Sequence, residues 1–302
     1  MLYDVPAPAK LNLFLHVVGR RPDGYHLLQT VFRFIDLSDV LSFDLRRDGQ
    51  LSCENDLDIP PESDLVLRAA RLLQQHTGVR QGAHIVCRKH IPAGGGLGGG
   101  SSDAATTLIA LNRLWQTGLD RTALARLGVQ LGADVPVFLY GQPAFAEGIG
   151  EQLTAVPVPD CAYLVVQPDA FVSTPEVFSA PELTRDSESI KITFFADWQK
   201  DCESFFGKND LEPVVMARYP AVQAAQKWLA QQGVVARMTG SGACMFAQYP
   251  DLQQASSNQK QIAGKIAVSL QESSNSTGSM PLSAIRQVWA CVGLQDHPLR
   301  YW

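Results

Sequence analysis

Motifs for metal binding and for disulfide formation are missing from this 302-residue chain. Its six cysteines are dispersed without a C-x-x-C pair, and its six histidines form neither H-x-x-x-H nor H-E-x-x-H. In a chain long enough to pack a core, cysteines used in this way are typical of reduced thiols in a cytosolic protein. We therefore expect a cytoplasmic protein without a protein-built metal site.

Long apolar runs and an excess of positive charge are also lacking. No run approaches the roughly 20 apolar residues of a membrane span, and residues 1–10 lack the basic-then-apolar pattern of a signal peptide. The formal net charge is −5, whereas nucleic-acid-binding proteins are usually basic. These absences exclude membrane and nucleic-acid partners and point to a small-molecule ligand.

Glycine, in contrast, is concentrated in one run, PAGGGLGGGSS at residues 92–102. Glycine backbones can approach a ligand closely, and a helix that starts directly afterwards presents free N–H groups and the positive end of its dipole. The run therefore predicts an anion site, most often one for phosphate. A flexible surface turn is the alternative, although six glycines would carry a large ordering entropy without a contact in return.

Three better-known phosphate loops fit this run poorly. Gly94, Gly96 and Gly99 satisfy G-x-G-x-x-G, but the acid at the expected distance, Asp120, stands at a predicted helix start. No Gly-Lys-Ser/Thr follows, which excludes a Walker loop, and no HRD or DFG of the protein kinases is present.

Residue patterning predicts an α+β fold in two domains, residues 1–155 and 156–302. Apolar alternation and short apolar runs predict strands over residues 11–16, 27–37, 40–45, 84–91, 161–167, 236–239, 244–248 and 288–292. Helical spacing predicts helices over residues 65–75, from Ser102 onward, 121–131 and 221–232. The polar stretch 271–280 predicts a mobile loop.

The glycine run resembles the signature loop of the galactokinase, homoserine, mevalonate and phosphomevalonate (GHMP) kinases. Four further segments are similar to the branch that phosphorylates a CDP-linked methylerythritol: PAKLNL at 8–13, RRPDGYH at 20–26, GADVPVF at 132–138 and MTGSGA at 238–243. The resemblance implies a first domain like domain 2 of ribosomal protein S5 and a ferredoxin-like second domain. It also implies ATP as co-substrate, bound between the domains with Mg²⁺.

The same resemblance implies two catalytic residues. Asp134 would be the general base, and Lys10 the cation that offsets its burial in an apolar run and faces the transferred phosphoryl group. Without the resemblance, a helix cap or turn is the favoured interpretation of Asp134, and a solvated strand end is the default for Lys10.

The ATP-binding residues implied are those of the glycine run itself: Pro92, Ala93, Gly94, Gly95, Gly96, Leu97, Gly98, Gly99, Gly100, Ser101 and Ser102. The two serines would cap the following helix, bond phosphate, or do both. Adenine is expected against residues 63–66 and the strand end at Lys89.

The substrate-binding residues implied are Asn12, Tyr25, His26, Phe32, Phe178, Gly240 and Ser241. Asn12 lies two residues from Lys10, hence on the same strand face. Tyr25 offers a ring to stack on cytosine and His26 a partner for its edge. Phe32 and Phe178 are further candidate walls, with core packing as the alternative. Gly240 and Ser241 either close over substrate phosphates or form a hairpin turn.

Taken together, these residues predict a kinase that acts on the 2-hydroxyl group of a CDP-linked methylerythritol in the non-mevalonate route to isopentenyl diphosphate. The alternatives are another small-molecule kinase of homoserine or mevalonate type, and an ATP-binding sensor without turnover. We expect a monomer or a weak homodimer.

Overall fold

Two long paired strands span the molecule. In the computed structural model, which describes residues 1–56, 59–198, 204–273 and 284–302, β1 (Leu2–Arg20) pairs antiparallel with β2 (His26–Arg46). Lys10 stands opposite Phe34, and Asn12 opposite Phe32. The strands predicted over residues 27–37 and 40–45 are one continuous strand, because Ser38 and Asp39 pair with Pro8 and Ala7 of β1 instead of forming a turn.

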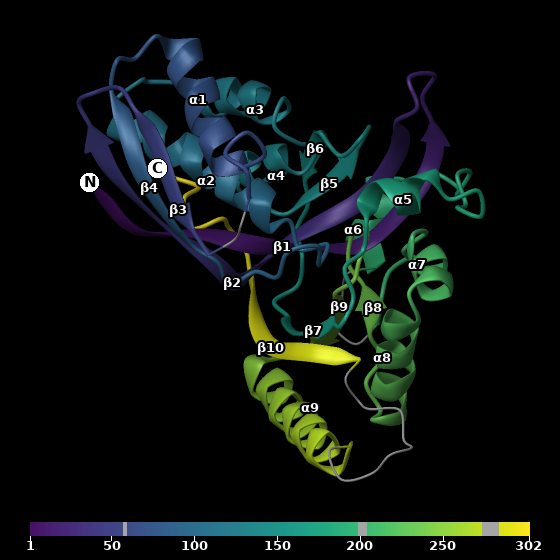
Figure 1. The fold of residues 1–302 in the computed structure, drawn as a ribbon. Helices are drawn as coiled ribbons and strands as arrows, with labels where there is room; N and C mark the ends of the chain where they lie inside the picture. The colour runs from purple at the N-terminus through teal and green to yellow at the C-terminus, as the bar shows by residue number, and fades with distance from the viewer. Residues whose placement is uncertain (57–58, 199–203, 274–283) are drawn as a thin grey trace.

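The strands form one extended sheet in the order β3-β4-β2-β10-β7-β9-β8 (Figure 1). Its members are β3 (Leu51–Asn55), β4 (Gly82–Arg88), β2, β10 (Ile285–Leu294), β7 (Ala162–Pro168), β9 (Met245–Tyr249) and β8 (Arg237–Met238). Off this path, β1 and β5 (Ala144–Glu147) pair with β2, and β6 (Gln152–Ala155) pairs with β5. β10 bridges the halves, since residues 285–292 pair with β7 and residues 293–294 pair with β2.

Helices cover the sheet in two groups (Figure 1). The first half carries α1 (Leu65–Thr77), α2 (Gly99–Leu114), α3 (Arg121–Gly128) and α4 (Val135–Tyr140). The second half carries α5 (Thr174–Ser179), α6 (Ile192–Trp198), α7 (Glu212–Arg218), α8 (Pro220–Gln231) and α9 (Leu252–Ser273). The mixed α+β, two-part architecture is confirmed.

Helix α9 was missed by the sequence patterns. It runs through a largely polar stretch, and among its described side chains Ala255 and Ile262 are buried, with Ile262 in the second core. A thin apolar stripe gives a weak helical period. The helix continues into the predicted mobile loop as far as Ser273, and the rest of that loop lies outside the described residues.

Apolar side chains of the described residues gather in three clusters, of which one lies where β1 and β2 meet β7 and β9 and includes Leu11, Phe14 and Val165. The other two are the first and the second core. The first lies between the first half of the sheet and helices α1, α2 and α4, and the second between the second half and helices α5, α7, α8 and α9. Leu15 and Val17 of β1 belong to the second core, and Leu299 near the end of the chain belongs to the first. The boundary near residue 155 stays a prediction.

Thiol chemistry differs from the expectation at one position. Cys161 is disulfide-bonded, whereas Cys53, Cys87, Cys244 and Cys291 are free thiols. The prediction that all six cysteines are reduced is therefore wrong for Cys161, because spacing along a chain does not show which cysteines meet in the fold. Among the described residues, no helix combines the length and the apolar character needed to cross a membrane.

Candidate active site

A cavity of about 910 Å³ opens where the two halves meet. Its walls come from β1, β2, the glycine run, the start of α4 and the turn between β8 and β9. All predicted site residues line this cavity except Ser102: Lys10, Asn12, Tyr25, His26, Phe32, residues 92–101, Asp134, Phe178, Gly240 and Ser241. Segments more than 200 residues apart in sequence thus meet at one site.

Lys10 and Asp134 form an ion pair inside the cavity. The Lys10 Nζ atom lies 3.2 Å from Asp134 Oδ2, and the lysine side chain is 3% exposed while that of the aspartate is 36% exposed. Asp134 stands at the N-cap position of α4, yet its side chain makes no capping hydrogen bond. The carboxylate therefore interacts with Lys10 in the cavity and does not cap α4.

Asn12 fixes the lysine from the other side. Lys10 Nζ donates to Asn12 Oδ1 at 2.6 Å, and Asn12 Nδ2 donates to Thr30 Oγ1 at 2.9 Å. The Thr30 hydroxyl in turn donates to the Phe14 carbonyl oxygen. Each group in this series of hydrogen bonds has a fixed donor or acceptor role, so the Asn12 amide cannot flip without loss of two hydrogen bonds. Thr30 was not anticipated, because a threonine in an apolar strand carries no sequence signal of its own.

Neighbouring segments of the fold constrain the backbone of the glycine run. Gly96 and Gly98 have φ of +72° and +73°, the left-handed region that glycine adopts without strain. A Cβ atom on Gly96 would lie 2.3 Å from the Thr239 carbonyl oxygen of the second half. Part of the glycine content is therefore required for close packing between the two halves, and the remainder leaves the loop backbone open to the cavity.

Helix α2 begins at Gly99, with Gly98 as a cap that provides no side-chain bond. The helix thus starts three residues earlier than predicted, and its first residues, Gly99, Gly100 and Ser101, line the cavity, where an anion site requires the start of a helix. Ser101 lines the cavity. Ser102 does not, since it is fully buried and its hydroxyl donates to the Pro8 carbonyl oxygen at 2.7 Å. The prediction that Ser102 caps the helix or binds phosphate is therefore wrong, because in the first turn it points toward β1.

The turn that holds Gly240 and Ser241 packs onto the glycine run. Ala243 N donates to the Gly94 carbonyl oxygen at 3.2 Å, and Asn12 N donates to Thr239 Oγ1 at 2.9 Å. The Asn209 amide braces the turn by donating to the Gly240 carbonyl oxygen at 2.9 Å. These bonds make the turn a fixed wall of the site.

Aromatic residues gather at the β1–β2 turn. Tyr25 is 60% exposed, whereas His26 is 8% exposed and its ring lies 5.2 Å from that of Phe178, centroid to centroid. Burial, reinforced by Arg185 and Arg20, lowers the pKa of His26 below its ordinary value. Tyr25 therefore projects from the turn, whereas His26 is turned inward.

Phe32 lines the cavity beside Lys10, whereas Phe178 lies beside His26. Phe32 is 2% exposed, and its ring centroid is 5.4 Å from Lys10 Nζ, a cation–π contact. Its ring therefore supports the lysine and belongs to the first core. Of the two aromatic walls predicted, the structure brings only Phe178 to the His26 end.

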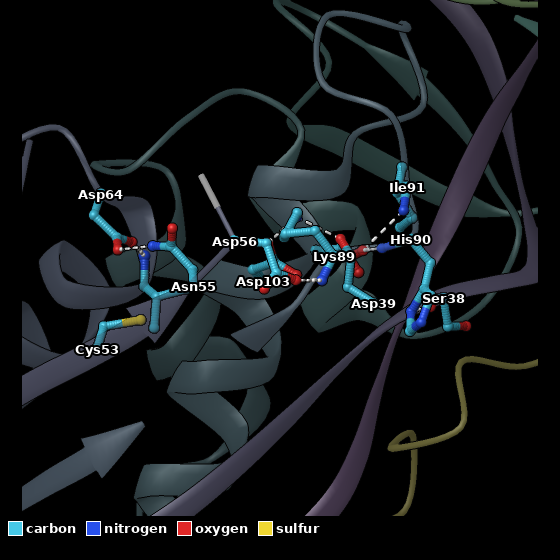
Figure 2. Close-up of polar contacts among 12 residues, drawn as sticks. Ser38, Asp39, Cys53, Asn55, Asp56, Asp64, Lys89, His90, Ile91 and Asp103 are labelled. Carbon is cyan, nitrogen blue, oxygen red and sulfur yellow. Dashed lines mark hydrogen bonds and ion pairs between the residues drawn. The ribbon is translucent and has the colours of Figure 1, made fainter. Parts of the chain in front are cut away.

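A buried charge cluster stands behind the glycine run, and Figure 2 shows Lys89 between Asp39 and Asp103. Asp39, fully buried in β2, accepts Lys89 Nζ at 2.5 Å and the backbone N–H groups of His90 at 2.5 Å and Ile91 at 2.8 Å. It thereby fixes the chain just before the run. Sequence reasoning missed Asp39 and Asp103, because an acid in a strand or first helical turn is by default solvated.

Two carboxylates share one ammonium in this cluster. Burial raises the pKa of Asp103, and the carboxylate of Asp39 adds to that rise against the pull of Lys89. Burial lowers the pKa of Lys89, but the two carboxylates more than reverse this, so that it is raised. The pKa of Lys89 and that of Asp103 are therefore both raised above their ordinary values.

The region expected to hold adenine adjoins this cluster. Residues 63–66 and Lys89 line the cavity together with Asn55. The Asn55 amide donates to Asp64 Oδ2 at 2.9 Å, and Asp64 Oδ1 caps α1 by accepting the Val66 N–H at 2.8 Å (Figure 2). The cap positions the start of α1 as one wall of this end.

Among the described residues, no group of three or more His, Cys, Asp or Glu side chains is arranged to hold a metal ion. Mg²⁺ commonly binds through one or two carboxylates together with the phosphates of a nucleotide. The half-exposed carboxylate of Asp134 and the Ser101 hydroxyl are the oxygen groups near the glycine run that fit such a shared role.

Comparison with known proteins places the chain in a family. The GHMP kinases N terminal domain matches residues 64–142, and the GHMP kinases C terminal domain matches residues 194–265. A 4-diphosphocytidyl-2-C-methyl-D-erythritol kinase of Bordetella parapertussis is 59% identical over all of this chain and 98% of its own length. One of Aromatoleum aromaticum is 52% identical over all of this chain and 96% of its own length.

Solved structures agree. A crystal structure of 4-(cytidine 5'-diphospho)-2C-methyl-D-erythritol kinase matches with a TM-score of 0.78 and 30% identity, over 95% of this chain and 98% of that one. A homoserine kinase from Cytophaga hutchinsonii matches with a TM-score of 0.67 at 16% identity, over 98% and 95%, and shares the fold alone.

The fold, the glycine loop and the two matched domains define a kinase of the GHMP class. Within that class, the chain belongs to the 4-diphosphocytidyl-2-C-methyl-D-erythritol kinase family. The family predicted from the four motifs is confirmed.

Proposed function

We propose that this chain transfers the γ-phosphoryl group of ATP to the 2-hydroxyl group of 4-diphosphocytidyl-2-C-methyl-D-erythritol, a step of the non-mevalonate route to isopentenyl diphosphate. The observation that carries the proposal is the Lys10–Asp134 pair, 3.2 Å apart, in a cavity bounded by the glycine run on one side and by Tyr25 and His26 on another. Phosphate, catalytic and base-recognition groups thus surround one space.

The reaction assigned to this site is an in-line displacement. Asp134 accepts the proton of the substrate hydroxyl, whose oxygen forms a bond to the γ-phosphorus as the bond to the β–γ bridging oxygen breaks and ADP leaves. Lys10, fixed by Asn12 at 2.6 Å, lies beside the Asp134 carboxylate and faces the charge that develops on the transferred group. Mg²⁺ bound to ATP would neutralise phosphate charge. The side-chain oxygens of Asp134 and Ser101 are the protein groups that would bind it.

The two ends of the cavity suit two different bases. We assign adenine to the wall formed by residues 63–66, Asn55 and Lys89, and the cytidine part of the acceptor to Tyr25, His26 and Phe178. The net charge of −5 and the small enclosed site support small-molecule partners without nucleic acid, for a cytoplasmic enzyme that works as a monomer or weak homodimer.

A coupled ADP-release assay tests the proposal. We expect turnover with 4-diphosphocytidyl-2-C-methyl-D-erythritol, far slower ADP release with homoserine or mevalonate, and competition between CMP and the acceptor. ADP release with homoserine or mevalonate at a comparable rate would return the other GHMP kinases as the function. ATP binding without ADP release from any acceptor would instead indicate a sensor.

A further inference from the structure

Arg185 contacts His26 from a distant part of the chain. Its Nε atom lies 3.1 Å from His26 Nε2, although the two residues are 159 positions apart. His26 opens β2 and lines the cavity, whereas Arg185 lies in the segment that follows α5. The contact therefore joins the base-recognition turn of the first half to a loop of the second half.

The guanidinium of Arg185 is held in one orientation by backbone carbonyls. Its NH2 atom donates to the oxygens of Phe178 at 3.2 Å and Ala180 at 2.6 Å. Its NH1 atom donates to those of Leu183 at 2.9 Å and Pro181 at 3.5 Å. Because a guanidinium is planar, four bonds to one short segment fix the direction of the remaining Nε–H, which points at His26.

This contact determines which nitrogen of His26 carries the proton. An arginine has five donors and no acceptor, so His26 Nε2 must be the acceptor. In a neutral imidazole the other nitrogen, Nδ1, then holds the proton and acts as a donor. Protonation of Nε2 would place two N–H groups against each other and break the contact.

The surroundings of the ring keep it neutral. His26 is 8% exposed, and Phe178 packs against its face at 5.2 Å. The charged groups that act on it are both cationic, Arg185 from the loop and Arg20 opposite it on β1. Burial and these two cations all disfavour a second positive charge, in agreement with the lowered pKa of His26.

We propose that Arg185 is a positioning residue that fixes His26 as its neutral Nδ1–H tautomer, so that the imidazole offers a hydrogen-bond donor to an acceptor atom of the bound cytidine nucleotide. This inference rests on the proposed function for its ligand, but the tautomer itself depends only on the contact between the two side chains. Arg185 thus contributes to specificity without touching the substrate.

The first test is spectroscopic and needs no substrate. Long-range ¹H–¹⁵N spectra of the full chain labelled at histidine report which ring nitrogen is protonated, and a His26→Gln variant identifies the His26 signals. We expect the Nδ1–H pattern in the wild type and a mixed or Nε2–H pattern in Arg185→Met. A wild-type ring in the Nε2–H form, or one doubly protonated near neutral pH, would overturn the proposal.

The second test separates KM from kcat. In Arg185→Met we expect the KM for the acceptor and the inhibition constant of CMP to rise about 10-fold, which corresponds to about 1.4 kcal/mol. The KM for ATP and kcat should change little, because Lys10 and Asp134 do not contact Arg185. Arg185→Lys, which keeps a cationic donor, should recover part of the loss. An unchanged acceptor KM in a variant with an altered tautomer would refute the role in specificity.

Arg218→Met is the matched control. Arg218 holds the same segment through Glu182, with its Nε atom 2.6 Å from Glu182 Oε1, and none of its described hydrogen bonds reaches His26. We expect both the tautomer and the CMP inhibition to stay as in the wild type. An Arg218→Met variant that reproduces the Arg185→Met phenotype would show that the segment, rather than the Arg185 contact, matters. Absence of CMP binding in the wild type would refute the cytidine assignment and leave the spectroscopic test of Arg185 intact.

Discussion

Replacement of Gly98 by alanine is the most direct test of the loop geometry. Gly98 caps α2 with φ of +73° and ψ of +20°. A residue other than glycine pays about 1–2 kcal/mol in this left-handed conformation. The new Cβ would in addition lie 3.1 Å from Lys10 Cγ, Lys10 Cε and Phe138 Cζ, closer than ordinary contacts. The catalytic lysine and the loop must therefore shift against each other.

The strain can appear in two ways, and both are measurable. If the loop keeps its shape, the free energy of unfolding falls by about 1–2 kcal/mol. If the free protein relaxes instead, ATP must restore the loop on binding, and its affinity falls by the equivalent factor of about 5 to 30. Because Lys10 is displaced as well, we expect kcat to fall in either case. Titration calorimetry with a non-hydrolysable ATP analogue, turnover and a thermal melt measure the three quantities.

Gly118 provides a matched control. Its φ is +70°, nearly that of Gly98, but a Cβ atom there would meet nothing within 4 Å, and it does not line the cavity. Gly118→Ala should therefore lose a similar amount of stability with unchanged ATP affinity and turnover. Wild-type ATP affinity and turnover in Gly98→Ala would refute the assignment of this loop as the phosphate site.

Three further predictions address catalysis, specificity and pH. Asp134→Asn should lower turnover by about 10²-fold or more and also lower the melting temperature, since the buried Lys10 ammonium loses its carboxylate partner; near-normal turnover would remove Asp134 from the mechanism. Tyr25→Ala should raise the acceptor KM by about 5- to 150-fold, from a stacking contribution of about 1–3 kcal/mol, and leave the KM for ATP unchanged, whereas the reverse pattern would contradict the assignment. Burial lowers the pKa of His297 from 6.5 to about 3, so below pH 6.5 the unfolded chain gains a proton that the folded chain excludes. Stability should then fall by about 1.4 kcal/mol per pH unit as pH drops toward the folded-state pKa. Urea unfolding at several pH values should show a smaller loss of unfolding free energy per pH unit for His297→Asn, and an equal loss would contradict the assignment.

Residues within continuous motifs were predictable from the sequence. Lys10, Asn12 and Asp134 occur in short segments whose residue types suit the chemistry, and the structure brings them together. Their ordinary alternatives, a solvated lysine and a capping aspartate, were distinguishable only in three dimensions. Asp134 is not a capping residue, because its side chain makes no hydrogen bond to the start of α4.

Residues joined across the fold were not predictable. The Asp39 and Lys89 side chains are 50 positions apart, and His26 and Arg185 are 159 apart. A single charged residue in a strand or loop has no local pattern that reveals a buried partner. Ser102 failed for a related reason, since a helix start displaced by one turn changes which side of the helix each hydroxyl faces.

The path of β10 has a consequence for how the protein is made. Residues 293–294 complete the pairing of β2, His297 contacts Phe34 and Phe138, and Leu299 fills the first core. During synthesis, residues 34–35 of β2 would therefore lack their second pairing partner, and the first core would lack Leu299, until almost 300 residues had been translated. We expect the early nascent chain to rely on chaperones and a truncation before residue 293 to impair ATP binding, although the ATP loop itself ends near residue 101.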